Sequence, residues 1–520
     1  MATLTPLRGK PQICKSTCPP QEQREASQPA GPCKPVGLHS VARLRPSEYS
    51  FDQQMLHRAR KSWGALASVA VATFLCSPDA NSPARAADRP STMGELPAAE
   101  SGSGNIIVWS HTDAEATEFE VLSQGARLFN KTPGHPRVEV LPSTTDYQYE
   151  DGVRSAAVTG TLPCLLDVDG PYLSEFAWAG YLRPLDALVP RELRTDLLPS
   201  VLAQGTYNGR LYSLGQFESG LGLWANLRYL KAAHVRIPTV AAPWSLAEFE
   251  QALEKLAAVP GVDYPLDLFF AVTSEFSPYA YAPILQGFGG DLVNRQRRLS
   301  ARGVLDGPQS VAAMKRIQYW LRRGWTRAVV DSDGFAQGRM ALSWRGHWKY
   351  RPYQQALGRD LVLLPLPDFG TGLKTATGSW SFGITTTCHD PAGAWAFLAF
   401  LMSKREILRM TDRIGAIPAR RSVLAHSPLY GKLGPLRIFT QQLEGGFGVP
   451  RPSTPAYHII SRSFSQAFVA VTAGDDAQAA LSRAASTIDA EIARNHGYPP
   501  EPWESTVTSR QDGEPGRAVP

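Results

Sequence analysis

Between residues 105 and 170, short apolar runs alternate with stretches whose apolar residues recur every three or four positions. The apolar runs have the length of single strands and cover 105–109, 138–141 and 164–168. The stretches with helical spacing cover 119–129 and 148–159. Strands that alternate with helices predict a parallel sheet, which binds ligands at the carboxyl ends of its strands. Asp169 follows the third run and is predicted to lie at such an end, unless it only forms a turn before Gly170.

An interrupted strand organises the middle of the chain. It opens with Asn208 and Gly209, the strongest short signal for a β-hairpin. Apolar runs at 211–214 and 221–224 flank a break of small and polar residues that includes Glu218. Glycine weakens a strand, and an unpaired buried carboxylate is costly. The break therefore indicates either a passage from one lobe into another, with Glu218 facing a wet cleft, or an edge strand with a bulge.

The rest of the chain continues this mixture of strands and helices. Further strands are expected at 269–272, 340–344, 361–364 and 380–385. Further helices are expected at 308–323 and 391–402, after Pro278, and after Ser245, which has Glu248 three positions later as in a capping box. The C-terminal third is expected to be mainly helical and to end near Asn495.

The length and the net charge of the chain limit the class of protein to which it can belong. The chain has 520 residues, which is too long for one core, and its 43% of hydrophobic residues suffices for globular packing. Two or more lobes are therefore expected. The formal net charge of +6 lies entirely within residues 1–86, and the remainder has equal numbers of basic and acidic residues. No basic field is left to indicate a nucleic-acid partner.

The first 86 residues have the features of a disordered extension followed by an export signal. Residues 1–54 lack periodicity and predict a disordered arm, unless translation starts at Met55. From Met55 a basic segment precedes an apolar run at 63–75 and a small-x-small cleavage pattern at 84–86. A lipid anchor at Cys76 is one alternative, and a short buried helix is another.

Neither the cysteines nor any known catalytic motif indicates a chemical reaction. Cys164 and Cys388 are too far apart for a zinc-binding spacing, but they can pair in an oxidising compartment. The sequence has no G-x-S-x-G, H-E-x-x-H or phosphate-loop motif, and its histidines are scattered. We therefore expect no cofactor and no metal.

Aromatic residues recur where the chain is expected to turn: Trp109, Tyr279, Tyr281, Trp344, Trp348 and Trp380. Flat rings suit the C–H faces of sugar rings, while Asp, Glu and Arg bond their hydroxyl edges. The alternative for each tryptophan is a place in the core. Trp320 and Trp395, which lie in expected helices, are assigned to the core.

Several segments resemble those of a known family when they are taken in their order along the chain. They are 167–169 with 175–185, 208–212 continuing to Asn226, 335–348, 378–384, 415–420 and 451–457. Together they resemble the extracellular solute-binding proteins of bacterial ABC importers, in the sugar-binding group that includes maltose-binding protein. The likeness runs from Asn105 to about residue 495, with Leu342 in place of a Met and His347 where the family often has Pro.

The resemblance implies an α/β fold: a two-lobed periplasmic-binding-protein-like clamp, in which each lobe is a mixed, mainly parallel sheet flanked by helices. The expected parts are the linker 87–104, lobe 1 with 105–215 and 375–430, lobe 2 with 216–374 and 431–497, and a disordered tail over 498–520. Crossovers between the lobes are expected near Gly215, within 369–378, and at one further C-terminal strand.

The resemblance also implies roles for the matching residues. Asp113 and Asp169 would bond sugar hydroxyls from lobe 1, and Glu218 would contact the ligand from the crossover unless its neighbour Ser219 holds that position. The residues implied on the other side are Tyr279 and Trp348 as stacking platforms, Trp344 and Trp380 as further platforms, and Arg420 as a donor to a hydroxyl or carboxylate.

The implied function is non-enzymatic. An exported monomer, periplasmic or at the cell surface, would capture a sugar or oligosaccharide between its lobes and deliver it to the transmembrane permease subunits of an ABC importer. Two other classes remain open from the sequence. One is a polysaccharide hydrolase or lyase that uses Asp169 and Glu218, and the other is a ligand-binding sensor protein.

Overall fold

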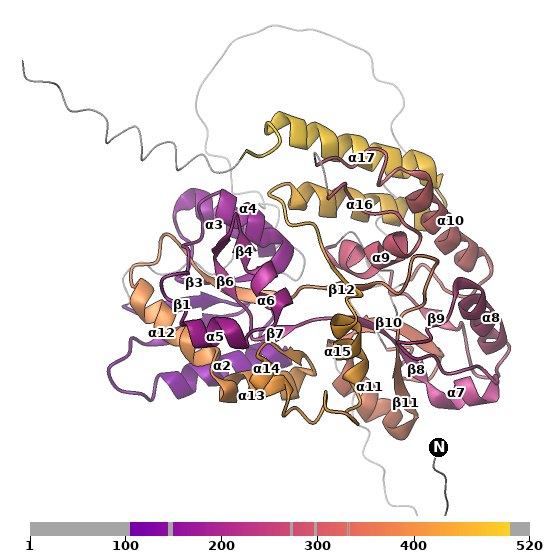
Figure 1. The fold of residues 1–520 in the computed structure, drawn as a ribbon, viewed down its shortest axis with the longest axis horizontal. Helices are drawn as coiled ribbons and strands as arrows, with labels where there is room; N and C mark the ends of the chain where they lie inside the picture. The colour runs from indigo at the N-terminus through magenta and orange to yellow at the C-terminus, as the bar shows by residue number, and fades with distance from the viewer. Residues whose placement is uncertain are drawn as a thin grey trace, which may run out of the picture. The chain divides into compact units, whose positions relative to one another are not determined.

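The computed structural model describes residues 104–143, 149–270, 274–295, 299–329, 331 and 333–499. They all belong to one unit, which spans Asp88–Pro520. Within this unit, two sheets form the centres of two lobes (Figure 1). The predicted export signal, Cys76 and residues 500–520 lie outside the described residues.

The sheet of the first lobe has the strand order β2-β1-β3-β13-β6. Its strands are β1 (Ile106–Trp109), β2 (Val138–Leu141), β3 (Leu165–Asp169), β6 (Ser213–Leu214) and β13 (Trp380–Ile384). Strands β2, β1, β3 and β6 run in one direction, and β13 runs against its two neighbours. The predicted parallel arrangement therefore holds for four strands, and a strand from late in the chain completes the sheet.

The sheet of the second lobe has the order β11-β8-β10-β9. Its strands are β8 (Leu221–Asn226), β9 (Leu266–Asp267), β10 (Leu342–Gly346) and β11 (Leu361–Leu364). Here β8 runs against β10 and β11, while β9 is parallel to β10. Each sheet thus has a single reversed strand, as a mixed, mainly parallel sheet requires.

Short strand pairs occur where the chain passes between the two sheets. They are β7 (Phe217–Glu218) with β14 (Ile417–Pro418), and β12 (Thr375–Thr377) with β15 (Gly448–Pro450). Strand β7 lies between β6 of the first sheet and β8 of the second, and β12 lies between β11 and β13. These segments bring residues from both lobes close together.

Helices surround both sheets (Figure 1). Those beside the first sheet are α2 (Thr117–Phe129), α3 (Tyr149–Thr159), η1 (Gly170–Tyr172), α4 (Leu173–Trp178), α5 (Arg191–Asp196), α6 (Pro199–Gln204), α12 (Pro391–Leu401), α13 (Lys404–Ile414) and α14 (Arg421–Leu424). Those of the second lobe are α7 (Leu227–Ala232), α8 (Leu246–Ala257), α9 (Phe276–Gly287), α10 (Pro308–Arg322), η2 (His347–Lys349), α11 (Tyr350–Leu357), η3 (Gly358–Asp360), α15 (Arg437–Glu444), α16 (Tyr457–Thr472) and α17 (Ala477–Arg494).

Local sequence signals explain several element boundaries. Asn208 and Gly209 have φ values of 45° and 75°, as a hairpin turn between β4 (Thr206–Tyr207) and β5 (Arg210–Leu211) requires. Ser245 and Glu248 form the predicted capping box at the start of α8.

The strand predicted at 269–272 is wrong for its described residues. The strand of this region, β9, ends at Asp267, and Phe269 has a φ of 48°. The Tyr281 hydroxyl donates to the carbonyl oxygens of Leu268 and Phe269, so these groups are satisfied outside a sheet. Residues 271–272 lie outside the described ranges. Two other elements are shifted: α9 begins at Phe276 rather than Pro278, and β10 begins at Leu342 rather than Met340.

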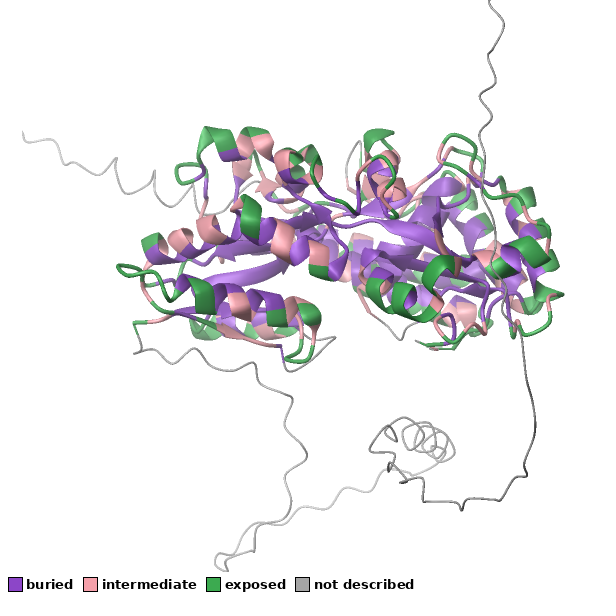
Figure 2. Cartoon of the chain, turned by 90° about the horizontal axis from the view of Figure 1, so that it is seen from below, coloured by how far each residue is buried: buried purple, intermediate pink, exposed green. Residues whose placement is uncertain are grey.

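The strands form the buried interior of each lobe, and the exposed residues lie on the outer faces of the helices (Figure 2). All five residues of β3 and all six of β8 are buried. Cys164 and Cys388 form a disulfide that joins the segments before β3 and after β13. Among the described residues, no helix combines the length and the apolar character needed to cross a bilayer.

Candidate functional site

A buried ionic network joins the two lobes. Arg451 donates from Nη1 and Nη2 to the two carboxylate oxygens of Asp169, both at 2.6 Å, and from Nη1 to Glu275 Oε1 at 2.7 Å. Asp169 ends β3 of the first sheet, whereas Glu275 directly precedes α9 of the second lobe. The side chains of Arg451 and Asp169 are 5% and 4% exposed. A bidentate pair this deeply buried holds both charged groups in one geometry.

Hydroxyl groups complete the network around Glu275. Tyr172, Tyr457 and Ser461 donate hydrogen bonds to its two carboxylate oxygens. Burial raises the pKa of Glu275, and the charge of Arg451 opposes that shift. Burial lowers the pKa of Arg451, but the charges of Asp169 and Glu275 and the hydrogen bonds to Asp169 act together against it and keep the pKa well above its usual value. Arg451 therefore stays charged at any physiological pH.

A small polar cavity of about 120 Å³ adjoins the Glu275 end of the network. Its wall is formed by α3 and η1 of the first lobe and by α16 and the residues just before α9 of the second: Glu150, Asp151, Arg154, Tyr172, Ser274, Glu275, His458, Ser461, Arg462 and Ser465. Every one of these side chains is ionisable or carries a hydroxyl. Burial raises the pKa of Glu150 to about 7. The segments from the first lobe follow the carboxyl ends of β2 and β3, where open α/β sheets bind ligands.

A larger cavity of about 990 Å³ adjoins the Arg451 end. Prolines, glycines and aliphatic residues of both lobes make up much of its wall, including Pro171, Pro199, Leu299, Pro450 and Pro455. Three buried polar atoms of residues in this wall have no hydrogen-bond partner: Gln204 Nε2, Glu218 Oε2 and Arg451 Nε. Both cavities thus offer polar groups, but the smaller one offers them far more densely.

Glu218 is buried rather than facing an open wet cleft. It is 0% exposed, and its Oε1 accepts hydrogen bonds from the backbone N–H groups of Ser219 and Gly378, both at 2.8 Å. Burial raises the pKa of its carboxyl, although these backbone bonds counteract the shift. The carboxylate therefore ties β7 to the residue after β12, which places it at the junction between the lobes.

Two of the sequence-predicted aromatic residues lie beside the network. The guanidinium of Arg451 lies over the ring of Tyr279, 5.0 Å from its centroid, and the Tyr279 hydroxyl donates to Ser219 Oγ at 3.1 Å. The ring centroids of Tyr279 and Trp348 are 6.0 Å apart, and Trp348 is half-buried. Asp169, Glu218, Tyr279 and Trp348 are therefore within reach of one interlobe region.

The other predicted residues have different surroundings. Trp344 is 1% exposed and donates from Nε1 to the Ala280 carbonyl, which is a core environment. Trp380 stacks on the His111 ring at a centroid distance of 3.6 Å, inside the first lobe. Asp113 is exposed and accepts two backbone N–H groups in the turn before α2. Arg420 pairs with Asp196 at 2.7 Å.

Sequence reasoning missed the two residues that join Asp169 to the second lobe. Arg451 begins segment 451–457, which resembles the solute-binding family, but the resemblance implied no role for it. Glu275 carries no local signal, because it lies between a predicted strand and a predicted helix. A candidate signal for Arg451 is its position before Pro452, in a segment without helical or strand periodicity. An arginine buried in such a segment needs a carboxylate partner, so this position could have indicated an ion pair.

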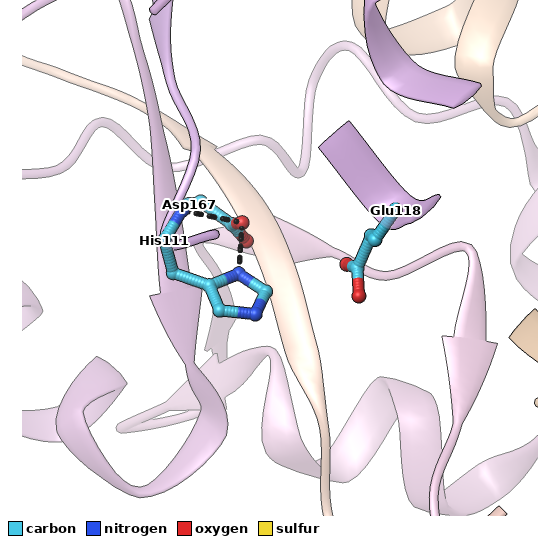
Figure 3. A group of neighbouring side chains, drawn as sticks. All are labelled: His111, Glu118 and Asp167. Carbon is cyan, nitrogen blue, oxygen red and sulfur yellow. Dashed lines mark hydrogen bonds and ion pairs between the residues drawn. The ribbon is translucent and has the colours of Figure 1, made fainter. Parts of the chain in front are cut away.

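A second polar cluster lies in the first lobe and was also missed. His111 Nδ1 shares a hydrogen bond with Asp167 Oδ2 at 2.6 Å, and Glu118 from α2 faces them (Figure 3). Burial lowers the pKa of His111, but the charges of Asp167 and Glu118 outweigh it and raise the pKa to about 8. Burial raises the pKa of Glu118 to about 7.

Comparisons with known proteins agree with this architecture. The sequence model described as bacterial extracellular solute-binding protein matches residues 126–432. An uncharacterized lipoprotein in the oleD 5′ region of Streptomyces antibioticus is 26% identical over 338 residues, which cover 62% of this chain and 71% of that protein. The maltotriose-binding protein of Pyrococcus abyssi is 21% identical over 341 residues, or 63% of this chain and 69% of that protein.

A solved structure shows the same fold. The GacH receptor of Streptomyces glaucescens, whose structures include complexes with acarbose and an acarbose homolog, aligns with a TM-score of 0.63 and 21% identity. The alignment covers 75% of this chain and 98% of the receptor. The two-lobed arrangement of the sheets is therefore shared over nearly the whole of that protein.

Proposed function

Because this chain belongs to the family of bacterial extracellular solute-binding proteins, we propose that it captures a sugar or short oligosaccharide between its lobes for delivery to an ABC-type permease. The relatives support the sugar: one is named for maltotriose, and the receptor that shares the fold was solved with acarbose. The observation that carries the proposal is the polar network of Asp169, Arg451 and Glu275, which both lobes build together.

We assign the sugar hydroxyls to the smaller cavity. Carboxylates accept hydrogen bonds from hydroxyls and guanidinium groups donate to them, and this wall holds both kinds. Tyr279 and Trp348 would stack on a ring that extends from it, with Asp169 and Glu218 holding the surrounding geometry. A volume of about 120 Å³ is below the range of about 300–1,000 Å³ usual for ligand pockets, so the lobes must open to admit an oligosaccharide.

The proposal also covers the lobe boundaries, the oligomeric state and the cellular location of the protein. The lobes comprise 105–215 with 375–430 and 216–374 with 431–497. The protein acts as an exported monomer, in the periplasm or at the cell surface, with lipid attachment at Cys76 as the less favoured form. The Cys164–Cys388 disulfide supports export, because disulfides persist in oxidising compartments.

We also propose that binding involves no covalent chemistry. The carboxylate of Asp169 is held by two guanidinium hydrogen bonds, so it is a poor general acid or base. Incubation of the protein with maltose, maltotriose and mannobiose should leave each sugar intact. Release of shorter sugars would support a hydrolase or lyase instead.

The decisive experiment is a thermal-shift and calorimetric series with mono-, di- and trisaccharides on the exported form of the protein. A sugar at a hundred times its Kd should add about 2.7 kcal/mol of stability. Glu150→Gln should weaken binding about tenfold or more, since a hydrogen bond to a charged group contributes about 1.5–3 kcal/mol.

Gln204→Ala is the matched variant in the larger cavity and should leave the affinity for sugar unchanged. If Gln204→Ala weakened binding and Glu150→Gln did not, the sugar would lie in the larger cavity. If no sugar shifted the melting transition while an amino acid or another solute did, the sugar assignment would fail.

A further inference from the structure

Three side chains from different elements of the first lobe converge outside both cavities. His111 follows β1, Glu118 lies in the first turn of α2, and Asp167 lies in β3. Each offers one ligand atom, and these atoms all lie within 4.8 Å of one another (Figure 3). Because both strands belong to one sheet and α2 packs beside it, the cluster is fixed by the lobe itself.

Asp167 has an unsatisfied oxygen at this point. It is 1% exposed, and its Oδ2 receives both the His111 ring nitrogen at 2.6 Å and the His111 backbone N–H at 3.3 Å. Its Oδ1 is buried without any hydrogen-bond partner. A buried carboxylate oxygen without a partner is costly, so a cation or a hydrogen-bond donor next to Oδ1 would be stabilising.

The histidine ring is held in position for a ligand role. Its plane stacks on Trp380 at a centroid distance of 3.6 Å and an interplanar angle of 3°. The ring therefore has little freedom to turn away from Asp167 and Glu118. Glu118 is half-buried, which leaves a path for an ion from solvent.

We propose that His111, Glu118 and Asp167 bind one divalent transition-metal cation, and that Zn²⁺ is the ion that fits them best. Imidazole nitrogen and carboxylate oxygen are zinc ligands at about 2.0–2.2 Å, and three protein ligands leave a fourth position for water. Mg²⁺ and Ca²⁺ prefer sites made only of oxygen, so the histidine selects against them. Nδ1 of His111 would exchange its hydrogen bond with Oδ2 for the ion, and Oδ1 of Asp167 can ligate while Oδ2 keeps the hydrogen bond from the His111 backbone N–H.

The metal site is independent of the sugar proposal. None of its three residues lines either interlobe cavity, and all of them lie in the first lobe. The ion would therefore bind whether the lobes are open or closed. Loss of sugar binding and loss of metal binding can be separated by titrating each ligand alone.

The test is a calorimetric titration of the chelator-treated full-length protein with ZnCl₂, followed by MnCl₂, CaCl₂ and MgCl₂. We expect one zinc per chain and a rise in melting temperature on zinc addition. Glu118→Gln should weaken zinc binding by at least about tenfold, the loss that even outer partners of a metal site produce. His111→Gln should do the same, but it also removes the Trp380 stack, so Glu118→Gln is the primary variant.

Glu115→Gln is the matched control, because Glu115 is exposed in the turn that precedes the same helix. It should bind zinc as the unaltered protein does. Anomalous scattering at the zinc edge should place one peak between the three side chains. Equal zinc affinity in the unaltered protein and Glu118→Gln, or binding of Ca²⁺ or Mg²⁺ in preference to Zn²⁺, would overturn the assignment.

Discussion

Replacing Arg451 by methionine should be the most damaging single change to the junction between the lobes. Methionine has a similar length but no charge, so Asp169 and Glu275 would remain as buried carboxylates without their shared partner. Removal of one member of a buried ion pair costs about 3–5 kcal/mol. The side chains of Arg451, Asp169 and Glu275 are only 5%, 4% and 21% exposed, so water cannot fully replace the guanidinium.

The loss should depend on pH in a defined direction. Without Arg451, nothing would oppose the effect of burial on Glu275 as strongly, so the pKa of this carboxyl would rise further above its value in the unfolded chain. A group whose pKa is raised on folding favours the folded state as pH falls. The deficit of Arg451→Met should therefore be largest near pH 7.5 and smaller near pH 5. Adding Asp169→Asn to Arg451→Met should recover part of the stability at pH 7.5.

Urea unfolding monitored by tryptophan fluorescence, at both pH values, measures these differences. Arg236→Met is the matched control, because Arg236 pairs with Glu248 at 2.8 Å but both side chains are 45% exposed. An exposed pair contributes about 0–1 kcal/mol. If Arg451→Met cost no more than Arg236→Met, or if its deficit were the same at both pH values, the network would not hold the lobes as described.

Three further changes test other parts of the structure. The double variant Cys164→Ser/Cys388→Ser should lower the free energy of unfolding by up to about 5 kcal/mol in urea titrations, because the disulfide closes a loop of 224 residues. Burial lowers the pKa of His347 to about 4, so the folded protein binds fewer protons than the unfolded chain between pH 6.5 and pH 4. The free energy of unfolding of the unaltered protein should therefore fall over this range by about 3 kcal/mol more than that of His347→Gln. An equal fall in both proteins would exclude this histidine as the cause. Gly346→Ala places a methyl group 1.9 Å from the Trp348 ring, so the ring must move. Calorimetry should then show about tenfold weaker sugar binding, as loss of a stacking contact predicts, and unchanged affinity would remove Trp348 from the sugar site.

Local signals predicted the elements well because their causes are local. Gly209 permits the positive φ of the hairpin, and Ser245 with Glu248 satisfies the first N–H groups of α8. The strand at 269–272 was wrong because its apolar, aromatic composition resembles a strand. There the side chain of Tyr281 satisfies the backbone carbonyls instead of a neighbouring strand.

The surroundings of Trp344 could have been predicted from strand geometry. Side chains alternate between the two faces of a strand, so Leu342 and Trp344 share one face of β10 while Ser343 and Arg345 share the other. Ser343 donates to Asp267, and Arg345 lies over the ring of Phe269, so the polar groups gather on that second face. Trp344 therefore packs with the aliphatic residues, whereas Trp348, two positions after the end of β10, is half-buried.

The partner of Asp169 could not be found in the same way. The residue types were visible, since Asp169 ends a predicted strand and Arg451 lies in a segment of family likeness. Their pairing spans 282 positions and depends on three passages of the chain between the lobes. A buried carboxylate requires some cation or donor, but the sequence offers many. Only the fold selects Arg451, because β15, which pairs with β12 at the junction, ends immediately before it, and its guanidinium lies between Asp169 and Glu275.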